Sequence, residues 1–299
     1  MSFANFVKRN TVLRSLLSGP RALRRRYLRW RAQPLNETLS ILSDILESDV
    51  IIRVKEFDGR FSLDARSDLF RRIAISGSYE PRLVDIFRRC VDPGRDVVDI
   101  GANAGFYSVL GAKLTKKRVL SVEPTTTMAK RLLINLALNN VSDQVVVFEG
   151  LVSDKTGVSS INFIPGKEEY SSIGKLVHPS IYGISYESRS VPSSTLDDLI
   201  RQHDLNPGII KVDVEGAEGL VFAGGLQTLK TYRPFVLSEF STVLLSNMGT
   251  SPQELISRFE QLNYVVLDPI DPKAKLGCRG FSDILAVPAE KNDSRIWET

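Results

Sequence analysis

The chain has 299 residues, of which 42% are hydrophobic and 25% charged, and its net charge is +4. This composition is typical of a soluble globular protein with one large core or two modest ones, and no run of about 18 apolar residues predicts a membrane-spanning helix. Two cysteines, Cys90 and Cys278, and two histidines, His178 and His203, are too few for a disulfide scaffold or a histidine-built metal site.

The first 33 residues contain nine Lys or Arg and no acid, so the rest of the chain is net negative. Leu23, Tyr27 and Trp30 recur there at helical spacing, which indicates a basic amphipathic helix. Three interpretations stay open: a helix packed on its own domain, an interfacial helix on anionic lipid, or an organelle-targeting segment. No nucleic-acid partner is expected, because no recognisable nucleic-acid module accompanies the arm. We expect a cytoplasmic protein, with peripheral membrane contact through residues 1–33 as one alternative; the oligomeric state is not predicted.

Residues 34–95 are predicted to form a separate segment between the basic arm and the main domain. Residues 36–48 have the apolar spacing of a short helix. Residues 50–64 are typical of a hairpin, because two alternating apolar runs flank the turn pair Asp58-Gly59. Residues 81–91 begin with Pro81 and continue with a helical period.

From residue 96 to about residue 290, apolar strands alternate with amphipathic helices. This alternation predicts an α/β domain with a doubly wound, mostly parallel sheet covered by helices on both faces. The expected strands are residues 95–101, 118–124, 144–154, 208–216, 234–240, 264–269 and 283–288, and the expected helices are residues 106–115, 126–140, 196–203, 219–232 and 251–263.

The first strand of this domain runs into the turn Gly101-Ala102-Asn103-Ala104-Gly105. In doubly wound sheets this turn makes the closest approach to a ligand, and glycine permits positive φ and backbone contact there. Glu123, about 20 residues later, ends the second strand, where an acid can bind both hydroxyls of a ribose. We therefore expect a ligand with an adenosine half; the alternative is a plain turn of the fold.

The spacing of the turn is G-x-N-x-G, whereas a dinucleotide site needs G-x-G-x-x-G, and no P-loop motif is present. Asp99, just before the turn, is poorly placed for a pyrophosphate but well placed for a cation. S-adenosylmethionine carries a sulfonium, an amino group and a ribose, so it is the cofactor that we favour. An NAD(P)-dependent oxidoreductase is the second hypothesis.

Several motifs together resemble the FkbM-type methyltransferases: SYEP, DIGANAGFYS, VEP, VSD, STLDDL, IIKVDVEGAE and PFVLSEF, in that order over about residues 76–245. The resemblance implies the Rossmann-like class I methyltransferase fold, with a seven-stranded sheet, and S-adenosyl-L-methionine as cofactor. It assigns the amino acid part of the cofactor to Asp99, Gly101, Asn103 and Gly105, the ribose to Glu123, the adenine to Ser153 and Asp154, and the methionine end to Tyr79 and Glu80.

The candidate catalytic residues lie at predicted strand ends. Asp213 and Glu215 are expected on one pleat face, and Glu239 ends the next strand. These three carboxylates are expected at one edge of the sheet, where the strands end, which we call the mouth. Their proximity is expected to raise the pKa of at least one of them or to bind a divalent cation. A role as a base or in binding the acceptor is favoured, purely structural roles stay open, and no metal site is assigned. His178, in the acceptor-facing residues 159–192, is an alternative base.

The resemblance implies methyl transfer to a hydroxyl of a sugar, a glycan or a secondary metabolite. Residues 159–192 are expected to form a strand and a long loop rich in Ser, Tyr and Gly, which suits hydroxyl-bearing ligands. A third hypothesis, from a different class, is a cofactor-binding module without turnover that docks through its basic arm.

Overall fold

A computed structural model describes residues 49–164, 171–174, 185–272, 276 and 281–292. The basic arm, the helix predicted at residues 36–48 and His178 lie outside these residues. The chain divides into two compact units, Met1–Asp49 with Asp64–Gly77, and Val50–Leu63 with Ser78–Thr299. The described part of the first unit is mainly the helix α4 (Asp68–Ser76), and the second unit holds all of the predicted site residues that the structure describes.

The predicted hairpin is present as β1 (Asp49–Val54) paired with β2 (Gly59–Asp64). Its turn is longer than the expected tight turn, because a 3-10 turn, Lys55–Phe57, precedes the left-handed Asp58. α4 was not predicted; the Ser67 hydroxyl caps its first turn by accepting a hydrogen bond from the Phe70 amide. α5 (Pro81–Cys90) begins at Pro81 as predicted.

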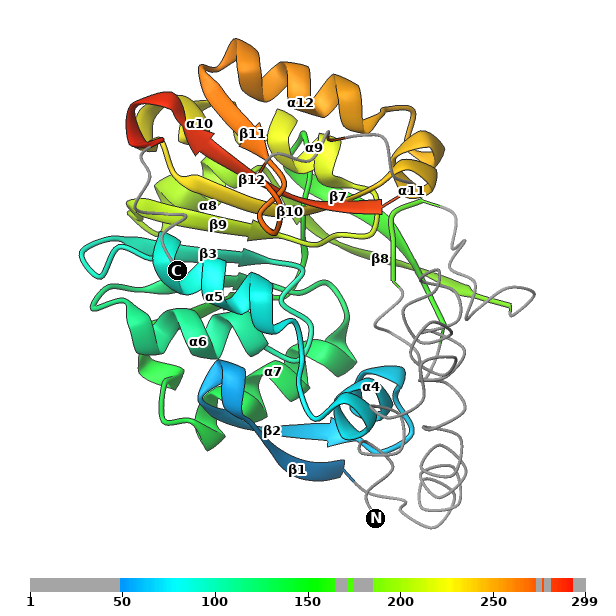
Figure 1. Cartoon of the computed structure of the whole chain (residues 1–299). Coiled ribbons are helices and arrows are strands. Elements are labelled where there is room, and N and C mark those ends of the chain that lie inside the picture. The colour runs from blue at the N-terminus through cyan, green and yellow to red at the C-terminus, as the bar shows by residue number, and fades with distance from the viewer. Residues whose placement is uncertain (1–48, 165–170, 175–184, 273–275, 277–280, 293–299) are drawn as a thin grey trace, which may run out of the picture. The chain divides into compact units, whose positions relative to one another are not determined.

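A seven-stranded sheet forms the centre of the second unit (Figure 1). The spatial order is β11-β12-β10-β9-β3-β4-β5; β10, β9, β3, β4 and β5 are parallel, and β12 is antiparallel to both of its neighbours. This confirms the predicted mostly parallel sheet. The strands are β3 (Asp96–Ile100), β4 (Val119–Val122), β5 (Val145–Phe148), β9 (Pro207–Val212), β10 (Phe235–Ser241), β11 (Tyr264–Leu267) and β12 (Phe281–Pro288).

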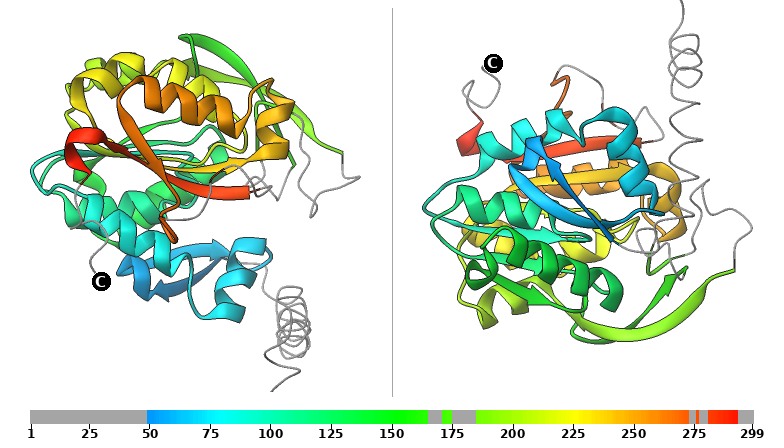
Figure 2. Two further views of the ribbon diagram at one scale, coloured as in Figure 1. Left: turned by 45° about the horizontal axis from the view of Figure 1, so that its top comes forward. Right: turned by 90° about the horizontal axis from the view of Figure 1, so that it is seen from below.

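Helices cover both faces of this sheet (Figures 1 and 2). One face packs on α5, α6 and α7: a methyl group on Gly111 of α6 would lie 2.9 Å from a methyl carbon of Val97. On the other face, Val98 and Ile210 share a buried core with Leu199 of α8 and Phe259 of α12. The remaining helices are α6 (Phe106–Leu114), α7 (Thr126–Leu138), α8 (Leu196–Gln202), α9 (Glu218–Ala223), α10 (Leu226–Tyr232), α11 (Thr242–Asn247) and α12 (Pro252–Gln261).

Two predicted elements are each divided in two. The strand predicted at residues 144–154 leaves the central sheet at Gly150, and its second part, β6 (Leu151–Val152), joins a three-stranded sheet of order β6-β8-β7. The helix predicted at residues 219–232 is interrupted at Gly224-Gly225, because the chain there lies against β6: a Cβ on Gly224 would be 2.1 Å from the Ser153 carbonyl oxygen.

The residues expected as a strand and a long loop contain a second strand. β7 (Gly157–Phe163) pairs antiparallel with β8 (Glu187–Ser194), which the sequence pattern had left in the loop. α11 was also not predicted. No helix among the described residues combines the length and the apolar character needed to cross a membrane.

Candidate active site

Every second residue of the turn after β3 has a left-handed backbone conformation. Gly101, Asn103 and Gly105 have φ values of +80°, +50° and +84°, in the left-handed region. The amides of Gly101 and Ala102 both donate to the Val122 carbonyl oxygen, at 3.0 and 2.9 Å. The turn is therefore fastened to the carboxyl end of β4.

Glu123, directly after β4, makes a second connection to the same turn. Its Oε2 accepts from the Asn103 amide at 2.9 Å, and its Oε1 accepts from the amide and the hydroxyl of Thr125, at 2.9 and 2.6 Å. The side chain is buried, and burial raises its pKa against the opposing effect of these hydrogen bonds. Glu123 thus fixes the turn relative to β4 as well as standing at the expected ribose position.

The glycines of the turn also serve contacts within the protein. A Cβ on Gly101 would lie 1.8 Å from the Asp213 carbonyl oxygen, and one on Gly105 would lie 2.4 Å from Cδ1 of Leu132. The Asp213 amide also donates to the Ile100 carbonyl oxygen at 2.9 Å. The end of β9 therefore lies directly against the turn, and Asp213 with it.

Asp99 points into the interior under the turn. Its side chain is buried and its Oδ2 accepts from the Ser108 hydroxyl at 2.6 Å, while Ser108 accepts from the Ser121 hydroxyl at 2.7 Å. Burial raises the pKa of Asp99, against the lowering effect of the nearby Lys211. This carboxyl group is held by the protein beneath the turn.

Tyr79 and Glu80 lie just before α5 and contact α6. Glu80 has a left-handed backbone, φ 47°, and its Oε2 accepts from the Tyr107 hydroxyl at 2.8 Å. The Tyr79 ring is 5.3 Å from the Phe106 ring and 6.0 Å from the Phe57 ring, measured between centroids. The structure thus places the pair beside the helix that follows the glycine turn.

Ser153 and Asp154 follow β6. The Ser153 amide donates to the Ser194 carbonyl oxygen at 2.9 Å, and its hydroxyl donates to Asp154 Oδ1 at 3.1 Å. Ser153 is buried and Asp154 is exposed. The pair stands at the junction of the central sheet and the three-stranded sheet.

The acids proposed for catalysis are near one another at the carboxyl ends of β9 and β10, but not as predicted. β9 ends at Val212, and Glu215 lies in the following turn with φ +50°, so Asp213 and Glu215 do not share a pleat face. Glu239 is directly opposite Asp283 in the antiparallel pairing of β10 with β12. Sequence reasoning missed Asp283, and an acid inside the apolar strand DILAVP was the available signal.

Burial and mutual repulsion change the protonation of these acids. Burial, followed by the charges of Asp213 and Glu215, raises the pKa of Glu239 well above its ordinary range. Burial, followed by the charge of Glu80, raises the pKa of Asp283 to about 6. Burial raises the pKa of Glu218 to about 7, and its Oε1 accepts from the Gly216 amide at 3.3 Å. Burial and the neighbouring charges thus favour the protonated form of Glu239, in which the carboxyl group can donate a hydrogen bond.

The raised pKa of Glu239 makes a prediction about stability. Because the pKa of Glu239 is higher in the folded chain than in the unfolded chain, where it is about 4.5, the folded state binds this proton more tightly. The stabilisation from proton binding at Glu239 is complete below about pH 4.5 and is lost as the pH rises. We expect Glu239→Gln, which cannot ionise, to have a flatter pH profile and to be about 1–2 kcal/mol more stable than wild type at pH 8. Urea unfolding at pH 5, 7 and 8 measures this; parallel profiles of the two proteins would contradict it.

A cleft of about 300 Å³ begins directly after Glu123. It lies between residues 124–127 and the β7–β8 pair, and its polar side chains include those of Thr125, Glu187 and Arg189. The Arg189 guanidinium is 5.0 Å from the centroid of the Phe163 ring, which also lines the cleft. Hydroxyl, carboxylate and guanidinium groups together can bind a ligand rich in hydroxyl groups.

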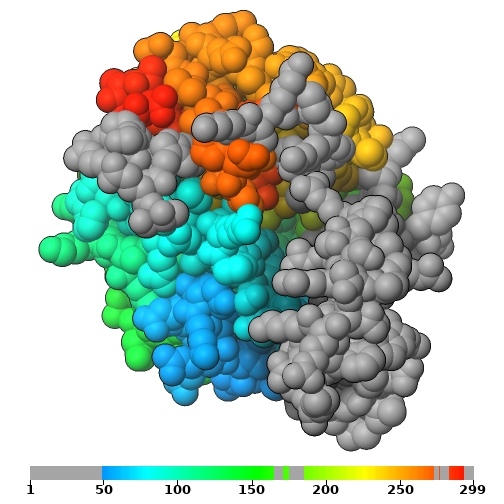
Figure 3. Space-filling view, viewed as in Figure 1, coloured from blue at the N-terminus to red at the C-terminus, as the bar shows by residue number. Residues whose placement is uncertain are grey.

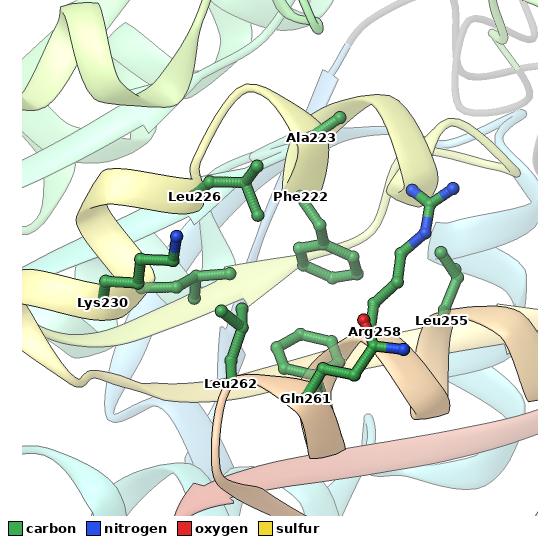
Figure 4. A pocket seen from close by; sticks show the side chains of 10 residues that line it. Phe222, Ala223, Leu226, Lys230, Leu255, Arg258, Gln261 and Leu262 are labelled. Carbon is green, nitrogen blue, oxygen red and sulfur yellow. The ribbon is translucent and has the colours of Figure 1, made fainter.

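A second groove, of about 480 Å³, contains none of the predicted site residues. It is lined mainly by apolar side chains of α9, α10 and α12, with Lys230 and Arg258 at its rim (Figure 4). These helices cover the sheet face opposite to Asp99. On the face shown in Figure 3, the cyan surface of α5 adjoins the orange surface of the residues after β11.

Within the described ranges, no three or more His, Cys, Asp or Glu side chains are arranged to hold a metal ion. Asp213, Glu215, Glu239 and Glu80 are brought to the mouth of the sheet beside the glycine turn, whereas His178 lies outside the described residues.

The strand order, with an antiparallel strand inserted next to the last parallel one, a glycine turn after the first strand and an acid after the second, defines the class I methyltransferase fold. The chain belongs to the FkbM methyltransferase family, whose domain, described as "Methyltransferase FkbM domain", it matches over residues 99–266. Membership of this family favours a methyltransferase over the second hypothesis, an NAD(P)-dependent oxidoreductase.

A curated relative, the 2-O-methyltransferase NoeI of Sinorhizobium fredii, is 30% identical over 162 residues, which cover 50% of this chain and 64% of the relative. The methyltransferase FkbM of Methylobacillus flagellatus is similar with 17% identity and a TM-score of 0.43, over 65% of this chain and 44% of that one. The O-methyltransferase from Bacillus cereus, solved in complex with SAH, is similar with 14% identity and a TM-score of 0.41, over 84% of this chain and 96% of that one.

Proposed function

We propose that this protein is an S-adenosylmethionine-dependent O-methyltransferase that methylates a hydroxyl group of a sugar, glycan or secondary metabolite. The observation that carries the proposal is the position of Glu123, which binds the glycine turn after β3 while Asp213 lies against the other side of that turn. A ribose site and a carboxylate for proton transfer are thereby joined through one rigid segment of backbone.

The donor groups of the site fit this cofactor. Glu123 Oε2, which accepts one hydrogen bond from the protein, can accept another from a ribose hydroxyl, and the exposed Asp154 can accept from the amino group of an adenine. The mouth contains Glu80, Asp213, Glu215 and Asp283 and is therefore suited to the ammonium and sulfonium charges of the methionine half. When bound, S-adenosylmethionine supplies a methyl group attached to a positively charged sulfur.

Asp213 is the side chain best placed to accept a proton from the acceptor. Its Oδ2 accepts from the Lys211 ammonium at 2.7 Å, and none of the described residues donates to its Oδ1. Oδ1 can accept a hydrogen bond from an acceptor hydroxyl, which orients the oxygen for in-line attack, and then take its proton. The raised pKa of Glu239 favours its protonated form, which can donate a hydrogen bond to a ligand oxygen in the same mouth.

Two observations support a hydroxyl-bearing acceptor. The cleft beside Glu123 presents Thr, Glu and Arg side chains, and the relative that shares 30% identity is named a 2-O-methyltransferase. A saccharide is recognised through hydrogen bonds of this kind, because its surface consists largely of hydroxyl groups.

Transfer of a radiolabelled methyl group from S-adenosylmethionine to a panel of saccharides tests the proposal. We expect transfer to at least one acceptor, with Asp213→Asn slowing it by at least about 100-fold and leaving the affinity for S-adenosylhomocysteine within about threefold of wild type. Asp143→Asn, at an exposed acid outside the site, is the matched control and keeps full activity. Binding of S-adenosylhomocysteine without transfer to any acceptor would favour a non-catalytic module.

A further inference from the structure

Lys211 is a buried lysine at the centre of the acidic mouth. It lies on β9 next to Asp99 of β3 in the parallel pairing of these strands, and its side chain is only 9% exposed. A buried ammonium is costly unless it is paired, and a cation is unexpected beside a site whose proposed ligand is itself a cation. The residue therefore needs an explanation beyond packing.

The contacts of Lys211 all belong to the site. Its Nζ donates to Asp213 Oδ2 at 2.7 Å and lies 5.1 Å from the centroid of the Tyr107 ring, whose hydroxyl donates to Glu80. Burial alone would lower the pKa of Lys211, but the charges of Asp213, Glu80 and Asp99 outweigh it and raise the pKa. Three acids of the site thus favour the charged form of Lys211.

Asp213 is fixed on two sides as a result. Its backbone is held against the glycine turn by the hydrogen bond to Ile100 and by contact with Gly101, and its carboxylate is held by Lys211. The side chain remains 32% exposed, so one oxygen is anchored and the other can meet a ligand. The Lys211–Asp213 pair sets both the position of this oxygen and the net charge next to the turn.

We propose that Lys211 is a positioning and specificity-determining residue, whose ion pair with Asp213 fixes the negative charge presented at the turn and thereby sets the relative affinity for the cationic cofactor and its neutral product. The inference rests on the proposed function, because it assigns the ligand charge that the site reads. Lys211 neutralises part of the negative charge of the acids. The acids therefore bind the cationic cofactor less tightly relative to its neutral product than they would without Lys211.

Calorimetric titration of the full chain with two probes tests this without an acceptor. The probes are S-adenosylhomocysteine, which is neutral, and sinefungin, an analogue with an ammonium group in place of the sulfonium. Lys211→Met is expected to raise the preference for sinefungin about tenfold, and Asp213→Asn to lower it by a similar factor. Lys211→Arg keeps the charge and is expected to keep the wild-type preference.

The outcomes separate the alternatives. A purely structural lysine would weaken both ligands in parallel, so an unchanged affinity ratio in Lys211→Met would overturn the inference. If that variant does not fold, Asp213→Asn decides alone, because its side chain is partly exposed, and an unchanged ratio there overturns the inference too. Failure of the wild-type protein to bind either probe would instead refute the proposed cofactor, and the inference with it.

Discussion

Glu123→Ala is expected to reduce the affinity for S-adenosylhomocysteine by at least about 100-fold, because it removes the carboxylate that we propose as the ribose acceptor. It also removes the partner of the Asn103 amide and of the Thr125 amide and hydroxyl. Donors left unpaired in a buried site each cost about 1–3 kcal/mol, so the loss of a partner for three donors is expected to destabilise the variant by at least about 3 kcal/mol. Calorimetric titration and urea unfolding measure the two effects separately.

A matched control for this variant is Glu149→Ala. Glu149 lies one strand away and accepts from the Thr126 hydroxyl at 2.6 Å on the surface, so its loss is expected to change the affinity less than twofold. NAD and NADP, titrated in parallel, are expected not to bind. Wild-type affinity in Glu123→Ala would show that this acid serves only to hold the turn, and the ribose would then need another site.

The fold could be predicted from the sequence where local pattern and tertiary contact agree. Strands such as β3 and β4 are short apolar runs that end at an acid or a glycine, and every predicted helix that lies among the described residues is present, although one is divided in two. The position of Glu123 followed in the same way, because an acid directly after the second strand of a doubly wound sheet must lie beside the turn after the first strand.

The acids of the mouth were harder to place, because their arrangement depends on pairings that are distant in sequence. Asp283 meets Glu239 only because β12 inserts antiparallel beside β10, which no local pattern indicates. Glu215 was assigned to a pleat because KVDVE continues the period of two, yet the strand ends at Val212, where the chain turns with positive φ. The sequence also offered no indication of the role proposed for Lys211, since the charges that act on it include residues of β3 and of the segment before α5.

The requirement for glycine at position 101 also depends on a tertiary contact, which the motif alone does not reveal. A glycine in this turn is expected from its φ of +80°, but the contact that excludes any side chain is the Asp213 carbonyl oxygen on the neighbouring strand. The backbone atoms on both sides are held by hydrogen bonds, from Gly101 to Val122 and from Asp213 to Ile100. The turn and β9 therefore cannot separate without breaking the end of the sheet.

Gly101→Ala is accordingly expected to lower the free energy of unfolding by about 3–5 kcal/mol and to abolish measurable binding of S-adenosylhomocysteine. The added methyl carbon would lie 1.8 Å from a backbone oxygen, so relief requires a shift of more than 1 Å between β3 and β9 at the point where Asp213 meets the turn. Urea unfolding gives the stability, and calorimetric titration at a temperature where the variant is folded gives the affinity.

Gly249→Ala separates this clash from the cost of the backbone conformation. Gly249 has a similar φ of +74°, but a Cβ there would meet no heavy atom within 4 Å, so its replacement is expected to cost only about 1 kcal/mol and to leave ligand binding unchanged. The difference between the two variants isolates the contact of the turn with β9. If both lose the same stability and both still bind S-adenosylhomocysteine, the close approach of Asp213 is not what holds the turn in its binding conformation, because the strain of positive φ alone would then account for the loss.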